Sequence, residues 1–210
     1  IHLIAGRISS ARNTASEMID RAAEINDLAH SILSQHASGM CEHFAGHFED
    51  AIRHFRSVII QYDPAADEEL KKYYVANPNV VAHCVMSWAQ VLGGQAPTSA
   101  VTIKEAMRLA EDQDHLFTRT YAYGITACYY QAAGDAKAAL HYASTAFQLS
   151  VDGEFPYWEA WSQILKGWAL AATGNTHDGI DELNEGLQKY RETGSKQIVP
   201  YALALLAEAH

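Results

Sequence analysis

Side chains that could bind a metal ion gather between positions 36 and 54. They are His36, Cys41, His43, His47 and His54. Imidazole nitrogens and thiolate sulfurs are preferred ligands of Zn²⁺, but a zinc site needs them to converge on one point at about 2.0–2.3 Å. Because the chain has 11 histidines, clustering of this kind arises easily by chance. We therefore favour histidines of a polar surface or groove, and we predict no metal.

Motifs for other chemistry are missing from the sequence. It contains no G-x-x-x-x-G-K-[ST] loop, no G-x-G-x-x-G, no H-E-x-x-H and no C-x-x-C. The G-x-S-x-G elbow of serine hydrolases is missing as well. An enzyme would need an unrecognised helical active site. We therefore predict no catalytic residues and no cofactor.

The composition indicates a folded, helical and acidic protein. Hydrophobic residues make up 49% of 210 residues, and only 5 are proline. The formal net charge is −10 and no dense Lys/Arg stripe occurs, so we expect no nucleic-acid partner. No apolar run approaches the roughly 18 residues that a membrane span needs, so we expect no membrane association. Three widely spaced cysteines favour the reducing cytoplasm over a disulfide scaffold.

A recurring glycine indicates where the helices that position these residues end. A small residue follows it about five positions later, in the pairs Gly6–Ala11, Gly46–Ala51, Gly94–Ala100, Gly134–Ala139 and Gly174–Gly179. The interval is 40 residues from Gly6 to Gly46 and again from Gly134 to Gly174. A fixed period of this length is typical of stacked helical repeats.

Each glycine is expected to end one helix, because it adopts the left-handed backbone that closes helices. Small residues also occur seven positions before the glycines, at Gly39, Ser87, Ala127 and Gly167. Small side chains on both helices allow the close approach of a tight hairpin. Asp135 is an expected N-cap of the following helix, and Asn175, Thr176 and Thr98 offer the same chemistry.

Apolar periodicity then predicts a right-handed α-solenoid of antiparallel helix pairs, in one array over residues 1–210. The expected helices are 10–26, 28–45, 47–61, 79–93, 97–112, 115–133, 136–151, 155–173, 177–193 and 197–210. The corresponding repeats are 1–27 (partial), 28–78, 79–114, 115–153, 154–195 and 196–210 (partial).

Two places depart from this regular pattern. Residues 62–78 hold eight extra residues with a charged segment, Asp67–Tyr73, which we interpret as a short helix or turn. This segment is either a structural connector or a binding loop. In the last helix, apolar residues are expected to lack a covering helix. They are Val199, Tyr201, Leu203, Leu205 and Leu206.

The repeat pattern resembles the tetratricopeptide repeat (TPR), a helix–turn–helix unit of about 34 residues. The matching residues are Tyr123, Thr126, Ala127, Tyr130, Ala139 and Ala143 in the third full repeat, and Gln163, Lys166, Gly167, Leu170, Gly179 and Leu183 in the fourth. The large aromatic residue that opens the TPR motif is present only as Tyr123, the late proline is missing, and the repeat is about six residues longer. The resemblance therefore implies a divergent, TPR-like array.

A second resemblance rests on four short strings that occur in a fixed order. They are Asp27–His30, Tyr62–Pro64, Gly167–Leu170 and Pro200–His210. Together they resemble the helical-repeat region of large bacterial signalling proteins. In that family, an AAA/STAND-type ATPase domain is joined to a class III adenylate or guanylate cyclase, or to a LuxR-type DNA-binding domain. The repeats are regarded as sensors, so the resemblance implies a regulatory region without the catalytic activity.

In such arrays the first helix of each pair lines the concave surface. The inward positions are His36, Met40, His43, Cys84, Trp88, Tyr121, Cys128, Gln131, Trp161, Ile164 and Trp168. Aromatic residues dominate recognition surfaces, so we predict a groove for a protein or peptide, or for a small apolar ligand. The alternative is that these residues pack between repeats.

Two functions remain open at this point. One is a sensor or regulatory region of a larger bacterial signalling protein. The other is a free-standing TPR adaptor or scaffold, with a possible homodimer through its terminal helices.

Overall fold

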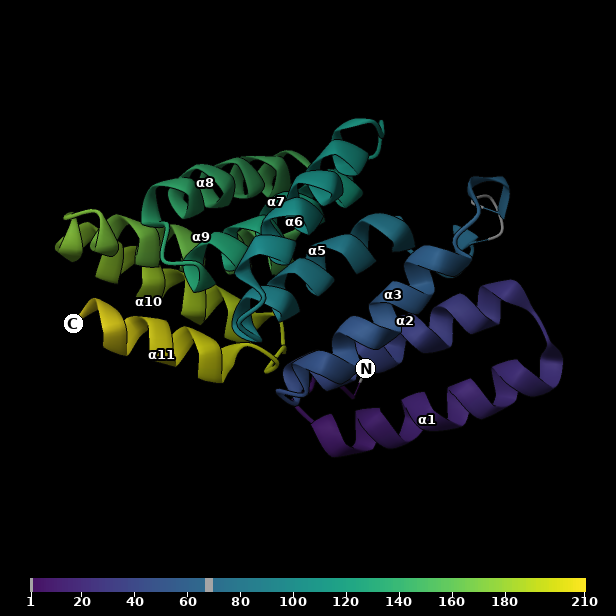
Figure 1. Ribbon diagram of the computed structural model, residues 1–210. Helices are drawn as coiled ribbons and strands as arrows, with labels where there is room; N and C mark the ends of the chain where they lie inside the picture. Colours follow the sequence, from purple (N-terminus) through teal and green to yellow (C-terminus); the bar gives the residue numbers. More distant parts are fainter. Residues whose placement is uncertain (1, 67–69) are drawn as a thin grey trace. The chain divides into compact units, whose positions relative to one another are not determined.

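The computed structural model of the chain describes residues 2–66 and 70–210. Within these ranges the chain forms ten α-helices and one 3-10 helix, η1, and no β-strand (Figure 1). In chain order they are α1 (Ile8–Ile25), α2 (Leu28–Phe44), α3 (Phe48–Gln61), η1 (Pro64–Ala66), α5 (Pro78–Leu92), α6 (Ala96–Glu111), α7 (Leu116–Ala132), α8 (Ala136–Asp152), α9 (Pro156–Ala172), α10 (Thr176–Glu192) and α11 (Val199–Ala209). The predicted all-α class of helix pairs is confirmed, and each predicted helix end lies within two residues of the observed one.

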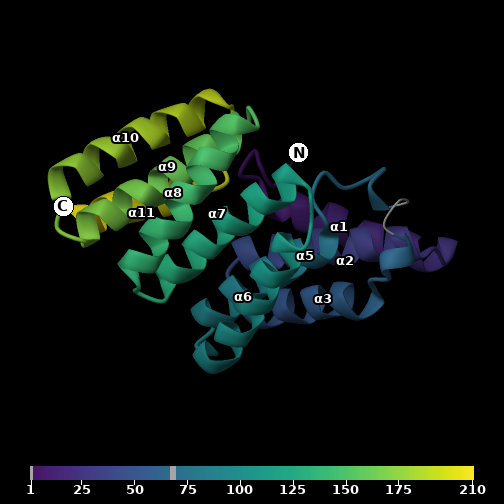
Figure 2. The same ribbon diagram turned by 90° about the horizontal axis from the view of Figure 1, so that it is seen from above.

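The chain divides into two compact units. Unit 1 contains Arg7–Asp112 and residues 2–3, with α1 to α6, and unit 2 contains Gln113–His210 with α7 to α11. Ile4–Gly6 belong to unit 2, because the backbone N–H of Lys196 donates to the carbonyl of Ile4 at 2.8 Å. Within each unit, consecutive helices run antiparallel and pack against each other (Figure 2). The grouping of all repeats into one array stays a prediction.

The turns inside the helix pairs follow the glycine pattern. Gly46, Gly94, Gly134 and Gly174 all have positive φ angles, between +76° and +105°, as predicted for helix-closing residues. The predicted N-cap Asp135 accepts a hydrogen bond from the backbone N–H of Ala138 at 3.0 Å. Of the other three cap candidates, Asn175 does occupy the N-cap position of α10, whereas Thr176 and Thr98 are wrong. The side chain of Asn175 makes no capping bond, and Thr176 and Thr98 lie inside their helices, α10 and α6.

Small residues bring the paired helices into close contact, most tightly in unit 2. A Cβ atom added to Gly179 of α10 would lie 2.5 Å from the backbone N of Ala171 and 2.6 Å from the carbonyl O of Gly167, both in α9. After Gly94 in unit 1, the predicted small residue Ala100 is wrong by one position, because Ser99 is fully buried while Ala100 is partly exposed. Ser99 lies five residues after Gly94, so it is the true counterpart of the other small residues.

Each unit has its own core. In unit 1 it includes Ile32, Phe55, Val58, Leu70 and Val80, all fully buried. In unit 2, the core centres on Trp161, Ile164, Leu165, Leu183 and Tyr190. Burial of a large apolar side chain contributes about 1.5–3 kcal/mol, so these residues hold the helix pairs together.

The connector between α3 and α5 packs back onto unit 1. Residues Asp67 to Glu69, within the charged segment predicted to form a short helix or turn, lie outside the described residues. Beyond them, Leu70 is buried, and the hydroxyl of Tyr74 donates to the carbonyl of Ile32 in α2 at 3.4 Å. The side chain of Asn77 then caps α5 by accepting from the N–H groups of Asn79 and Val80. This segment is therefore at least a structural connector.

The last helix is better covered than its sequence suggests. Leu205 is buried, and α11 packs against α9 and α10. Val199, Tyr201 and Leu206 keep partial exposure, whereas Leu203 is exposed. The prediction that all five residues lack cover is wrong, because α11 turns one side towards its own unit. None of the helices in the described ranges is long and apolar enough to cross a membrane.

Candidate functional site

The residues predicted to line a groove fall into two groups, one in each unit. Most are buried: His43, Cys84, Trp88, Cys128, Trp161, Ile164 and Trp168. Partial exposure remains at His36, Met40, Tyr121 and Gln131. A buried side chain offers no surface to a ligand in this conformation. The seven buried positions therefore act as packing residues here, which was the alternative that the sequence left open.

In unit 2 the inner positions meet beneath the chain's own last helix. The indole Nε1–H of Trp161 in α9 donates to the sulfur of Cys128 in α7 at 3.2 Å. The hydroxyl of Tyr201 in α11 donates to the side-chain oxygen of Gln131 in α7 at 2.7 Å. Burial raises the pKa of the Cys128 thiol to about 12 and that of Tyr201 well above its ordinary value. These groups are therefore neutral, hydrogen-bonded packing partners.

In unit 1 the inner histidines are enclosed by aromatic rings. The ring of His43 in α2 lies 4.4 Å from that of Trp88 in α5, and the ring of His36 lies 5.1 Å from that of Tyr74 in the connector. Burial lowers the pKa of His43 to about 3 and that of His36 to about 4. Nδ1 of His43 and Nε2 of His36 have no hydrogen-bond partner among the described residues. Both imidazoles are therefore neutral at physiological pH.

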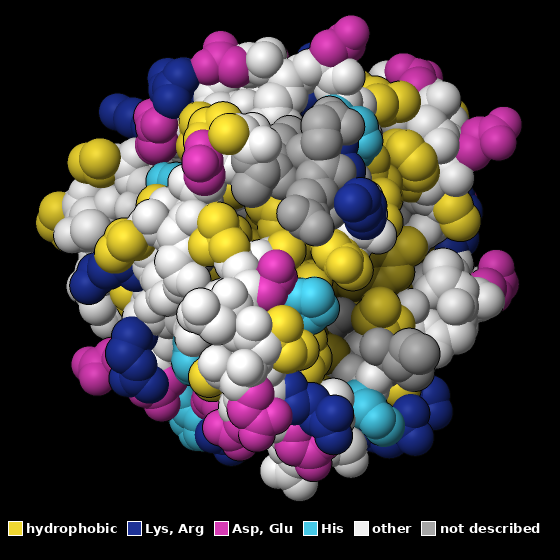
Figure 3. Space-filling model, turned by 90° about the vertical axis from the view of Figure 1, so that its right-hand side faces the viewer, with side chains coloured by type: hydrophobic (Ala, Val, Ile, Leu, Met, Phe, Trp, Pro, Cys, Tyr) yellow, Lys and Arg dark blue, Asp and Glu magenta, His cyan; other side chains and the backbone are white. Residues whose placement is uncertain are grey.

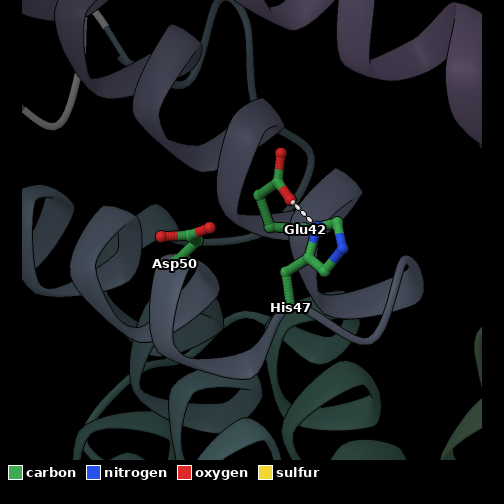
Figure 4. A group of neighbouring side chains, drawn as sticks. All are labelled: Glu42, His47 and Asp50. Carbon is green, nitrogen blue, oxygen red and sulfur yellow. Dashed lines mark hydrogen bonds and ion pairs between the residues drawn. The ribbon is translucent and has the colours of Figure 1, made fainter.

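The five candidate metal ligands named from the sequence do not converge on one point. His43 lies against Trp88, His54 contacts the side-chain oxygen of Gln35 at 2.7 Å, and Cys41 is buried near Ala11 and Ala15. Within 2–66 and 70–210, one group of three donors could hold a metal ion: Glu42, His47 and Asp50, whose ligand atoms all lie within 4.8 Å of one another (Figure 4). Of the five candidate ligands named from the sequence, only His47 belongs to this group.

A different surface of unit 1 exposes large apolar side chains. We call it the apolar end; it consists of Ile25, Leu28, Ile60, Tyr73 and Val75, all exposed. Because the helices are antiparallel, the C-terminal end of α1, the N-terminal end of α2 and the C-terminal end of α3 lie at this end of the unit. The connector to α5 begins there. Figure 3 looks onto this end and shows hydrophobic side chains at the surface. Apolar groups concentrated at one end of a unit are typical of an interaction surface.

A polar pair lies next to the apolar end. Asp27 caps α2, because its carboxylate accepts from the backbone N–H of His30 at 2.9 Å and contacts the ring Nδ1 of His30 at 2.6 Å. These backbone and ring hydrogen bonds lower the pKa of Asp27. The His30 ring in turn lies 5.7 Å from the ring of Tyr73. The apolar end is thus flanked by an ionised carboxylate, in the manner of an interface with a polar rim.

The sequence indicates residues 62–78 as a connector or a binding loop, but the neighbouring ends of α1, α2 and α3 were missed, because the other candidates were inward helix positions. The available signal was the Tyr73–Val75 run in a segment that is eight residues longer than the repeat requires. Loops that exceed the length needed for a connection are often functional. Similarly, the carboxylates of Glu42 and Asp50 lie five residues before and three residues after His47, a spacing that joins two helices across one turn.

Comparison with known proteins adds no assignment to this geometry. No protein-family model matches the chain, and no curated protein matches it.

Proposed function

We propose that the chain is a non-catalytic interaction module of TPR-like helical repeats that binds a protein or peptide partner through the apolar end of unit 1. The observation that carries this proposal is the set of five exposed apolar residues at the converging helix ends. Single exposed apolar side chains are ordinary on protein surfaces, but a group of them at one end of a unit is typical of a surface that a partner covers. The exposed apolar side chains and the carboxylate of Asp27 suit a partner segment with apolar anchors and a basic flank.

The surface is built on rigid elements, which supports a role in recognition. Ile60 and Leu28 lie in helices that are anchored by the buried residues Ile32, Phe55 and Val58. Tyr73 is held by its neighbour Tyr74, whose hydroxyl reaches α2. A preorganised surface loses little conformational entropy on binding, so its apolar area contributes more fully to affinity. The connector thus serves as part of the binding surface, the second of its two interpretations.

Replacing Ile60 with glutamate is expected to weaken partner binding at least about tenfold, or about 1.4 kcal/mol. The substitution places a charge among apolar contacts, and Ile60 is 76% exposed, so the fold should tolerate it. The matched control is Val101→Glu, because Val101 is 70% exposed on α6 of the same unit but lies outside the apolar end. The affinity of both variants is measured by calorimetry with the partner that the wild-type chain captures from its source cells. Equal affinity of the two variants would remove the apolar end from the proposal.

We further propose that the module is the sensor or regulatory region of a larger bacterial signalling protein in the cytoplasm. The four sequence strings support the regulatory role in a larger signalling protein. The three buried cysteines form no disulfide, which supports a reducing compartment. An immunoblot of source cells with an antibody against this chain is expected to show a band far above 23.1 kDa. A band at 23.1 kDa would instead favour a free-standing adaptor.

The adaptor alternative is favoured by one observation, the exposed side of α11. Leu203, Ala204 and Ala207 are all exposed on this terminal helix. If this side forms a homodimer, the mass in solution should double as concentration rises, and Leu203→Glu should abolish the change. Light scattering across a concentration series measures this. A constant monomer mass for the wild-type chain excludes the dimer.

A further inference from the structure

We propose that Glu42, His47 and Asp50 form a binding site for a divalent transition-metal ion of the zinc class, which links the end of α2 to the start of α3. The three ligand atoms lie within 4.8 Å of one another (Figure 4). In a tetrahedral zinc site with bonds of about 2.0–2.1 Å, ligand atoms are about 3.3 Å apart. Small side-chain rotations therefore bring them to the metal, and water completes the fourth position.

The backbone places these donors together through one tight turn. Glu42 lies in the last turn of α2, His47 is the N-cap residue of α3, and Asp50 lies in the first turn of α3. Gly46, with a φ of +82°, reverses the chain between them. The ring of His47 makes no capping hydrogen bond to the helix, so it is not committed to the backbone. Instead, its Nδ1 lies 2.6 Å from Oε2 of Glu42.

Arginines orient both carboxylates without occupying all of their oxygens. Arg12 donates to Oε1 of Glu42 at 2.8 Å, which leaves Oε2 directed at His47. Arg53 pairs with Oδ1 of Asp50 at 2.7 Å, which leaves Oδ2 for a metal. Hydrogen bonds to the non-ligating atoms of carboxylates fix their orientation and are a regular feature of metal sites. The same arginines balance part of the negative charge, so the two carboxylates can lie close together before the metal arrives.

The donor set also indicates the class of ion. One imidazole and two carboxylates are a mixed nitrogen and oxygen set, which suits Zn²⁺ and its neighbours better than Ca²⁺, which prefers oxygen ligands alone. Burial would by itself raise the pKa of Glu42, but the hydrogen bonds from Arg12 and His47 outweigh it and hold that pKa below its usual value. Glu42 is thus available as a carboxylate.

The test is calorimetric titration of the full, tag-free chain with Zn²⁺. We expect one ion per chain, and we expect His47→Ala and Asp50→Asn each to weaken binding at least about tenfold. The matched control is His177→Ala, because His177 lies in the first turn of α10, is 91% exposed and lies 3.5 Å from the carboxylate of Asp181. It should bind as the wild-type chain does.

A second readout separates ligation from folding. Co²⁺ bound in place of Zn²⁺ should give the visible absorption of a four-coordinate site in the wild-type chain and lose it in both variants, while circular dichroism shows unchanged helix content. Binding of much less than one ion per chain overturns the proposal. So does an affinity of His47→Ala equal to that of the wild-type chain, which would assign the metal to the other histidines.

Discussion

Replacing Gly179 with alanine is expected to lower the free energy of unfolding of unit 2 by about 2–3 kcal/mol. In the middle of a helix, alanine normally gains up to about 1 kcal/mol over glycine. Here the new methyl group would lie 2.5 Å from the backbone N of Ala171 and 2.6 Å from the carbonyl O of Gly167. Backbone atoms cannot rotate away as side chains do, so α9 and α10 must separate and lose the burial of Leu183 and Ile164.

The matched control is Gly124→Ala in α7 of the same unit. Its added Cβ would meet only the ring of Trp158, at 3.0 Å, and a ring can shift by a few tenths of an ångström. We expect this variant to lie within about 1 kcal/mol of the wild-type chain. Urea unfolding followed by tryptophan fluorescence reports on unit 2, which holds three of the four tryptophans. A Gly179→Ala variant as stable as Gly124→Ala would mean that the two helices are not in close contact.

Acid is expected to destabilise unit 1 well before its carboxylates are protonated. Burial lowers the pKa of His43 to about 3, whereas an unfolded histidine titrates near 6.5. Between these values the unfolded chain binds more protons than the folded chain. The stabilisation from the neutral ring is therefore complete above about pH 6.5 and is lost as the pH falls. The free energy of unfolding falls by about 1.4 kcal/mol per pH unit, so about 2.7 kcal/mol is lost by pH 4.5.

His36 adds to this effect, because burial lowers its pKa to about 4. The contribution of His43 is isolated by His43→Gln, which has a similar volume and does not titrate. The stability of this variant should fall less steeply between pH 6.5 and 4.5 than that of the wild-type chain. Urea unfolding at a series of pH values measures both proteins. Parallel curves for the wild-type chain and His43→Gln would show that His43 is accessible to protons in the folded state.

The helices were predictable because their signals are local. A glycine with positive φ closes each first helix, and a small residue five positions later lets the second helix approach, as at Gly174 and Gly179. Both requirements act within a few residues of the turn. The one error of register, Ala100 for Ser99, arose because either residue is small enough and only the packing distinguishes them.

The groove was not predictable to the same degree, because burial depends on distant segments. Periodicity predicts that Gln131 and Cys128 face inward from α7, and in the structure both side chains interact with Tyr201, which lies 70 positions from Gln131. In unit 1, Tyr74 reaches α2 at Ile32, 42 positions away, and packs on His36. A helical pattern states which side of a helix is turned inward; it does not state which segment fills the space.

The most direct test of the interaction module is photo-crosslinking from the apolar end in source cells. A photoreactive phenylalanine analogue is placed at position 60, at position 75 and, as control, at position 101. The account predicts that one and the same protein is captured from positions 60 and 75, that position 101 does not capture it, and that this protein binds the purified wild-type chain. Equal capture from all three positions, or different proteins from 60 and 75, would contradict the apolar end as a binding surface.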